Sequence, residues 1–175
     1  MASIIKANQL QDFGGNSILT SDGAGVVTPN ANGIKNTPAF QVKQTSGQSI
    51  SSASFTKLTW DTEDWDTDNA FASDKFTVPN NEAGKYYFQV TTEFAGIDDA
   101  EFVQVMFYKN GSSQGGTTAR WYSPSASDDV RARTNSILDL SAADYVEAYV
   151  YHNEGAAVTT NAGETFFRGY KLIGV

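Results

Sequence analysis

The chain has 175 residues, with 12 Lys or Arg, 20 Asp or Glu and no cysteine, so its formal net charge is −8. This balance argues against a nucleic-acid binder, which needs cationic side chains against phosphates. The absence of thiols excludes disulfides, thiolate zinc sites and a cysteine nucleophile. No apolar stretch approaches the ~20 residues of a membrane-spanning helix, and the first residues lack a signal-peptide pattern.

Residues 1–36 differ in sequence pattern from the rest of the chain and are predicted to form an N-terminal arm. Short apolar groups alternate with glycine- and asparagine-rich turns, which argues against a helix. Strands this short cannot bury a face alone, so we expect the arm either to be disordered or to lie along a partner surface. The apolar residues expected to dock the arm are Ile4, Ile5, Leu10, Ile18, Leu19, Val26 and Val27.

From residue 37 to residue 175 the pattern predicts an all-β globular head. The expected strands are 39–44, 55–60, 75–79, 84–94, 101–111, 118–123, 132–141, 144–153 and 164–175. Short polar connections, such as Asn110-Gly111 and Asp128-Asp129, separate them. This spacing, without a sustained helical period, predicts a β-sandwich or jelly roll.

Several of these strands are apolar on both faces. In residues 102–108 only Gln104 is polar, and in residues 145–151 tyrosines alternate with smaller side chains. A two-layer sandwich needs one apolar face per strand, so the second face predicts a homo-oligomer, the alternative being a monomer with tyrosines on its surface. The residues expected in the subunit interface or core are Tyr86, Phe88, Phe102, Met106, Tyr108, Tyr145, Tyr149 and Tyr151.

An ordered set of segments in the head resembles a known family. The segments are PAFQV, FTKLTWDTEDWDTDNAF, KFTVPNNEAGKYYFQV, VMFYKNG, SILDLSAADYVEAYVY and TFFRGYKLI. Together they resemble the globular head of complement component one-q, in the tumour-necrosis-factor jelly-roll superfamily. The sequence departs from the family by two extra residues between Phe76 and Gly84 and by Ala143 at a usual turn glycine. The resemblance implies a jelly roll that assembles as a homotrimer.

The arm is similar to the short-strand repeats that open bacteriophage tail-fibre and virion-fibre proteins, through the segment IIKANQLQDFGGNSILTSDGAGVVT. Arm and head together imply a non-enzymatic structural protein on the surface of the phage particle. In this interpretation the arms of three chains intertwine in a short stem that docks a homotrimeric fibre knob to other virion proteins. The head is exposed to a host glycan or receptor. A capsid decoration protein bound to the shell, a secreted lectin-like adhesive module and a depolymerase are the alternatives.

The acidic segment LTWDTEDWDTDNAF, residues 58–71, raises the question of a metal. Asp64, Asp66 and Asp68 have the alternate spacing of calcium ligands. An EF-hand is excluded because Asn69 replaces its glycine and Lys75 its glutamate. We expect a polar loop anchored by Trp60, Trp65 and Phe71. A calcium site and a carbohydrate platform built on Trp65 are the alternatives. A second acidic cluster is Asp98, Asp99 and Glu101. No cofactor is expected otherwise.

No catalytic constellation is evident in the sequence. His152 is the single histidine and is expected at the surface after a strand. Asp128 and Asp129 with Arg131 and Arg133 are expected to form a self-neutralising surface loop. Ligand-binding candidates, chosen because arginine and aromatic side chains often form binding hot spots, are Trp65, Arg120, Trp121 and Tyr122.

Overall fold

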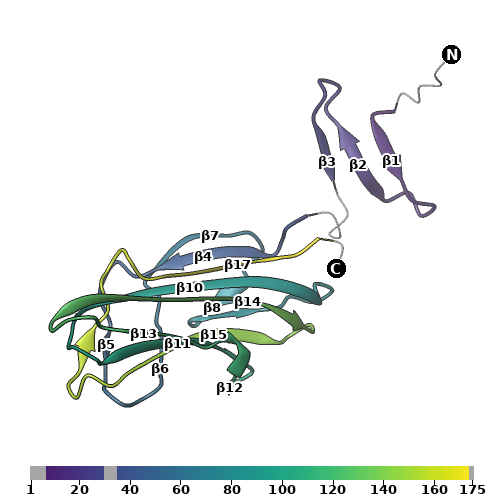
Figure 1. Ribbon diagram of the computed structural model, residues 1–175. Coiled ribbons are helices and arrows are strands. Elements are labelled where there is room, and N and C mark those ends of the chain that lie inside the picture. The colour runs from purple at the N-terminus through teal and green to yellow at the C-terminus, as the bar shows by residue number, and fades with distance from the viewer. Residues whose placement is uncertain (1–6, 30–34, 174–175) are drawn as a thin grey trace.

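The computed structural model describes residues 7–29 and 35–173 and consists of two parts (Figure 1). The N-terminal part is an antiparallel sheet with the order β1-β2-β3. Its strands are β1 (Gln9–Gln11), β2 (Ser17–Ser21) and β3 (Val27–Pro29). The expected docking residues Ile4 and Ile5 lie outside the described residues.

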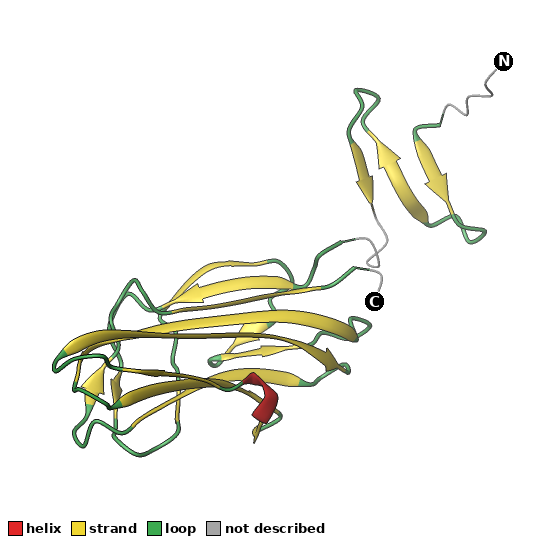
Figure 2. Cartoon of the chain, in the orientation of Figure 1, coloured by secondary structure: helices red, strands yellow, loops and turns green. Residues whose placement is uncertain are grey.

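The head contains two larger sheets that face each other (Figure 2). The five-stranded sheet has the order β14 (Asp128–Leu140), β10 (Gly84–Ile97), β17 (Phe166–Lys171), β4 (Ala39–Lys43) and β7 (Thr62–Asp66). The seven-stranded sheet follows the path β12 (Ser112–Ser113), β11 (Phe102–Lys109), β15 (Tyr145–His152), β9 (Lys75–Thr77) and β8 (Phe71–Ala72). Its remaining strands are β13 (Ala119–Tyr122), which pairs with β11, and β6 (Thr56–Lys57), which pairs with β15.

Shorter elements complete the head. Strands β5 (Ser49–Ile50) and β16 (Val158–Thr159) form a two-stranded sheet, and η2 (Gly115–Thr117) is a single turn of 3-10 helix. In the part of the chain that the structure describes, no helix has the length and apolarity needed to cross a membrane.

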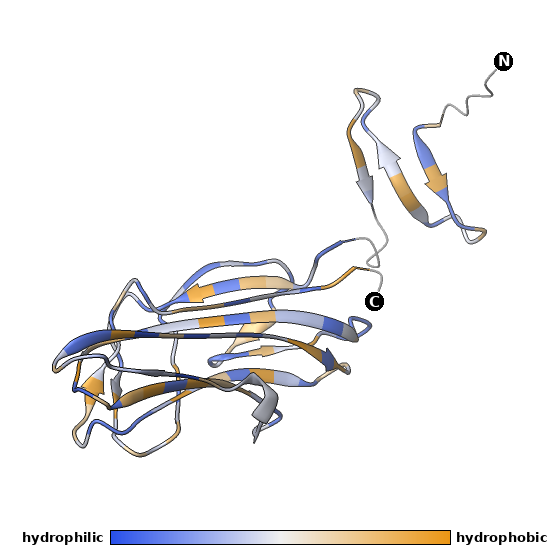
Figure 3. Ribbon diagram, in the orientation of Figure 1, coloured by the Kyte–Doolittle hydropathy of each residue, from blue (hydrophilic) through white to orange (hydrophobic). Residues whose placement is uncertain are grey.

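The core lies between the two large sheets and is rich in phenylalanine. Phe40 on β4 is fully buried and stacks on Phe71 and Phe76 at centroid distances of 4.9 and 5.1 Å. The ring of Phe167 on β17 meets Phe40 edge-on at 4.9 Å. Orange and blue segments alternate along several strands in Figure 3 because successive side chains point to opposite faces. Burial of these rings against the opposite sheet is the main stabilisation of the head.

The predicted all-β jelly-roll sandwich is confirmed, with local differences. Of the expected strand 55–60 only Thr56–Lys57 is a strand, β6, and two acidic segments also differ. The middle of the acidic segment is not loop: residues 62–66 form edge strand β7, with Trp65 paired opposite Gln41 of β4. Strand β14 begins at Asp128 rather than at residue 132, so the expected acidic loop is the start of a long strand. The charged residues in these two segments hid the strands from sequence inspection, because an exposed edge strand tolerates charged side chains.

The head has two distinct ends. At one, here called the arm end, β4 begins and β17 finishes: Ala39 pairs with Tyr170, and the amide of Lys171 donates to the Pro38 carbonyl at 3.0 Å. Strand β10 runs from this end to Ile97 at the opposite end, here called the far end. There the amide of Asp98 donates to the Glu154 carboxylate at 2.8 Å. The chain therefore enters the head at the end opposite the loops that follow β10 and β15.

Candidate functional site

An apolar row crosses the outer face of the five-stranded sheet near the arm end. Ile137 on β14 lies opposite Tyr87 on β10, and Tyr87 lies opposite Tyr170 on β17. The tyrosine rings are 5.3 Å apart between centroids. Ile137 and Tyr170 are 56% and 38% exposed, whereas Phe88, the residue after Tyr87 on β10, points inward and is fully buried. This row, Ile137–Tyr87–Tyr170, is an apolar surface that the single chain leaves open to solvent.

A row of hydrogen-bonding side chains runs beside the apolar row. The register aligns Asn135, Gln89, Arg168, Gln41 and Trp65 across the sheet. The Arg168 guanidinium donates twice to the Gln89 amide oxygen, at 2.9 and 2.6 Å. Amide and guanidinium groups beside an apolar centre are typical of protein–protein interfaces, in which a polar rim surrounds a buried apolar core.

The residues predicted for the interface or core divide into two groups. Tyr86 and Phe88 are fully buried between the sheets and therefore belong to the core of the head. The Tyr86 hydroxyl donates to the Glu82 carbonyl at 2.5 Å, and burial raises the pKa of this phenol well above its usual value. The remaining six are on the outer face of the seven-stranded sheet: Phe102, Met106, Tyr108, Tyr145, Tyr149 and Tyr151.

These six residues already cover one another within a single chain. Tyr108 stacks on Tyr149 with a centroid distance of 3.8 Å, and Phe102 stacks on Tyr151 at 5.7 Å. Met106 between the strands is only 6% exposed. The predicted strands with apolar side chains on both faces are confirmed. On the outer face of the seven-stranded sheet, however, neighbouring side chains shield much of the apolar surface from solvent. The Ile137–Tyr87–Tyr170 row is less shielded.

Lysine side chains also shield the outer face of the seven-stranded sheet. The ammonium of Lys75 lies 4.4 Å from the centroid of the Tyr145 ring, and Lys57 forms an ion pair with Glu147 at 3.2 Å. Burial, followed by the neighbouring Glu147 carboxylate, raises the pKa of the Tyr149 phenol. The face therefore presents neutral hydroxyls and paired charges over stacked rings.

The predicted ligand-binding residues are not brought together into one site. Arg120 and Tyr122 share the outer face of the seven-stranded sheet, where the Arg120 guanidinium lies 4.0 Å from the Phe102 ring centroid. Trp121 points to the other face of edge strand β13, and Trp65 belongs to the five-stranded sheet. Sequence inspection missed Phe55, which is exposed and packs on Tyr151 at 5.0 Å. Its position in a loop before β6 gives no periodic signal.

The acidic candidates do not converge as metal ligands. The Asp64 carboxylate accepts hydrogen bonds from Gln41 and Lys43 at 2.8 and 2.5 Å, and these bonds lower its pKa. The Asp66 carboxylate accepts from the amide of Phe71 at 2.7 Å and caps the loop after β7. Among residues 7–29 and 35–173, no three acidic or histidine side chains are grouped to hold a metal ion, and this covers Asp68, Asp98, Asp99 and Glu101 as well.

Trp60 and Phe71 pack against the core as expected, whereas Trp65 is 44% exposed and does not anchor the loop.

His152 and Arg131 both differ from expectation. His152 is fully buried rather than at the surface, and its Nε2 lies 3.0 Å from the Ile50 carbonyl oxygen. Arg131 does not neutralise Asp128 and Asp129 but forms ion pairs with Glu93 and Glu164 at 2.7 and 2.6 Å. In each case a long-range partner on another strand, which local sequence does not reveal, determines the side chain's role.

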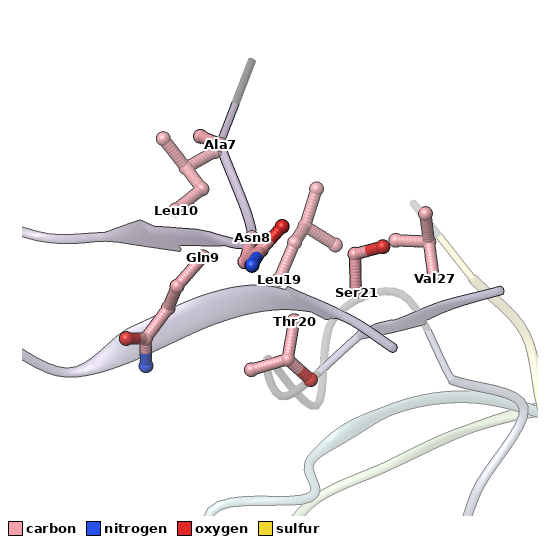
Figure 4. A pocket seen from close by; sticks show the side chains of 8 residues that line it. All are labelled: Ala7, Asn8, Gln9, Leu10, Leu19, Thr20, Ser21 and Val27. Carbon is pink, nitrogen blue, oxygen red and sulfur yellow. The ribbon is translucent and has the colours of Figure 1, made fainter. Parts of the chain in front are cut away.

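Leu10, Leu19 and Val27 gather on one face of the arm sheet, whereas Gln9 and Thr20 point to the other (Figure 4). Leu10 on β1 pairs with Leu19 on β2. Val27 on β3 pairs with Ser21, which is two residues after Leu19 on β2 and therefore lies on the same face. Leu10 and Val27 are 54% and 57% exposed. They rim a shallow hollow of about 140 Å³ whose lining also includes Ala7 and Asn8. We call Leu10, Leu19 and Val27 the apolar arm face.

The other expected docking residues do not belong to this face. Ile18 points to the side opposite its neighbour Leu19 because β2 alternates. Val26 precedes β3 in a turn and is exposed. The described part of the arm forms a three-stranded sheet of its own, whereas the sequence predicted either a disordered arm or one that lies along a partner surface.

Comparisons with known proteins identify the fold of the head. No protein-family model and no curated protein matches the chain. The solved globular domain of a zebrafish complement 1qA protein is similar, with a TM-score of 0.59 and 16% identity over 77% of this chain and 97% of that one. Murine APRIL is similar with a TM-score of 0.57 and 14% identity over 77% of this chain and 98% of that one. The chain thus contains a jelly roll of the complement one-q and tumour-necrosis-factor type.

Proposed function

We propose that the chain is a non-enzymatic structural protein of a phage virion surface. Three copies join through their heads, the arms attach the assembly to the particle, and the far ends of the heads face the host. The observation that carries this proposal is the pairing of a jelly-roll head, with an open apolar row near the arm end, with an arm sheet whose apolar face is uncovered.

The heads associate through the outer face of the five-stranded sheet in this proposal. Its Ile137–Tyr87–Tyr170 row offers exposed apolar surface beside the Arg168–Gln89 pair, whereas the rings of the seven-stranded sheet stack on one another. Tyrosine suits such a contact because its ring is buried while its hydroxyl keeps a polar partner. The number of copies and the placement on a virion come from the resemblances of head and arm.

A trimer explains how a small head attaches firmly to a cell. Three weak sites on one rigid assembly bind a repetitive surface much more tightly than one site does, because the second contact is made at high effective concentration. The aromatic surface around Phe55, Arg120 and Tyr122 would remain outward-facing and is available for contact with a host glycan or receptor.

Sedimentation of the full chain and of residues 37–175 tests the assembly. Both are expected to sediment as trimers, and Ile137→Glu is expected to give monomers because it places a charge in the apolar row. Tyr122→Ser is the matched control, since Tyr122 is 60% exposed on the other sheet. A monomeric wild-type head, or a trimeric Ile137→Glu variant, would refute this interface.

Electron microscopy of particles labelled with an antibody against the head tests the location. Label at the tail tip supports a fibre, and label over the shell supports a decoration protein. The decoration role is favoured by the compactness of the arm, whose strands lie within residues 9–29. Absence from particles would leave the adhesive-module alternative. Release of sugars from host polysaccharide would instead establish an enzyme; none is expected.

A further inference from the structure

We propose that the apolar arm face meets the same face on two other copies, so that three arm sheets close into a prism-like stem with Leu10, Leu19 and Val27 inside. The inference rests on the proposed trimer and deepens it: the uncovered face of the arm is filled by the chain's own copies, not by a virion partner. Attachment to the particle then uses the outside or the tip of the stem.

The two faces of the arm sheet differ in how their polar groups are satisfied. The face opposite Leu19 carries Ile18 but is otherwise polar, and on it the Thr20 hydroxyl donates to the Thr28 carbonyl at 3.4 Å. The Thr20 hydroxyl and the Gln9 amide on this face are suited to contact with water. Leu10 and Val27 have no apolar layer above them within the described chain, so the two-faced sheet is half of a sandwich.

Charge favours identical copies as the covering surface. Residues 7–29 contain only two ionisable side chains, Asp12 and Asp22, and both lie in turns. The Asp12 carboxylate accepts the amide of Asn16 at 2.9 Å, and the Asp22 carboxylate accepts the amide of Ala24 at 2.7 Å. The apolar arm face therefore carries no charge. Three copies of this face can therefore meet without electrostatic repulsion. The face also has no charged group that would attract a partner of opposite charge.

The head keeps the three arms close together. Pro29, the last residue of β3, is ten residues from Ala39, the first residue of β4. A chain of that length reaches at most about 35 Å. Arms tethered this way to one trimeric head meet at an effective concentration on the order of millimolar. A small sheet of this kind is marginal alone, and closing three around one axis supplies the missing opposite layer.

Single-cysteine variants of the full chain test the stem, because the natural sequence has no cysteine. Leu19 and Thr20 are neighbours on the central strand β2 and point to opposite faces. After mild oxidation, Leu19→Cys is expected to give disulfide-linked pairs of chains on a denaturing gel, and Thr20→Cys is not. In the unoxidised trimer, maleimide should modify Leu19→Cys roughly tenfold more slowly than Thr20→Cys.

A second matched pair on β3 guards against local misfolding: Val27→Cys is expected to cross-link and Thr28→Cys is not. Equal cross-linking or equal labelling within both pairs would overturn the stem. If that happens in a chain that still sediments as a trimer, the head assembly stands and only this inference fails. If the full chain sediments as a monomer, the proposed function fails as well.

Discussion

The arm and the head use the same backbone arrangement and differ in what covers their apolar faces. Both consist of antiparallel strands in regular register. In the head, Phe40 and Phe167 are fully buried against the opposite sheet, whereas in the arm Leu10 and Val27 are more than half exposed. Backbone pairing therefore fixes the shape of both regions, but only the head has a second layer that makes the pairing stable.

The largest expected difference between the two regions comes from deleting apolar side chains. Phe40→Ala should destabilise the head by about 3–5 kcal/mol because it leaves a cavity among Phe71, Phe76 and Phe167. Leu10→Ala should leave the unfolding free energy of the head unchanged. Guanidinium unfolding followed by tryptophan fluorescence measures both. A comparable loss in the two variants would show that the arm and head form one cooperative unit.

Glycine has different roles in the two regions, which gives a second test. In the head, a Cβ at Gly169 would lie 2.6 Å from Cδ1 of Phe88 and 2.9 Å from the Tyr87 carbonyl oxygen. Gly169→Ala is expected to destabilise the head by about 1–3 kcal/mol through overpacking.

Gly115 is the matched control, because a Cβ there would meet nothing within 4 Å. In the arm, Gly23 is equally uncrowded but has a φ of +79°, so it serves a turn rather than close packing. Similar melting temperatures for Gly169→Ala and Gly115→Ala would contradict the packing argument.

Turn carboxylates provide a smaller, pH-dependent comparison. The Asp144 carboxylate in the head accepts from Asn110 at 2.7 Å, pairs with Lys109 at 2.9 Å and accepts the Ser141 amide at 2.8 Å. These contacts, led by the Asn110 hydrogen bond, lower its pKa from 3.8 to about 2. The ionised group thus stabilises the head above pH 3.8, and that contribution is lost as the pH falls toward 2.

Asp144→Asn should therefore cost about 1 kcal/mol at neutral pH, and the difference from wild type should disappear in acid. The pKa of Asp12 in the arm is likewise lowered, chiefly by its hydrogen bond with the Asn16 side chain. Its replacement by Asn should not change the pH dependence of head unfolding. Urea titrations at several pH values separate the two, and a difference between Asp144→Asn and wild type that persists unchanged in acid would be inconsistent with this assignment.

The smallest effect on stability is expected at a turn in the head where a residue other than glycine has a positive φ. Arm turns place Gly15 and Gly25 at positive φ, whereas the head places Ala143 at φ 68°. A side chain in this region costs roughly 1 kcal/mol, so Ala143→Gly should stabilise the head by about that amount, less the greater freedom of glycine when unfolded. A lower melting temperature for the variant would show that the alanine methyl group makes a compensating contact.

The sequence predicted the head much better than its surfaces. The predicted two-faced apolar pattern of residues 102–108 is present, with Val103, Val105 and Phe107 fully buried on the inner face, because strand periodicity separates the two faces. The same alternation could not show that Tyr108 and Tyr149 stack on each other, since that depends on the register between two distant strands.

Long-range pairing also explains the other errors. The Ile137–Tyr87–Tyr170 row assembles from three strands, each contributing one side chain, so no single segment reveals it. His152 is the last residue of β15, a strand with tyrosines on its outer face, but its ring reaches the carbonyl of Ile50, about a hundred residues earlier in the chain. Strand β7 was hidden by its acids, which an edge strand accepts on its exposed side.

The arrangement of the two ends of the head has a practical consequence for protein engineering. The turn between β15 and β16 lies at the far end, beside Asp98, while the arm enters beside the end of β17. A peptide epitope inserted next to Gly155, where a Cβ would meet nothing within 4 Å, would be displayed outward on every copy of the proposed trimer. The head could thus serve as a scaffold for multivalent antigen presentation.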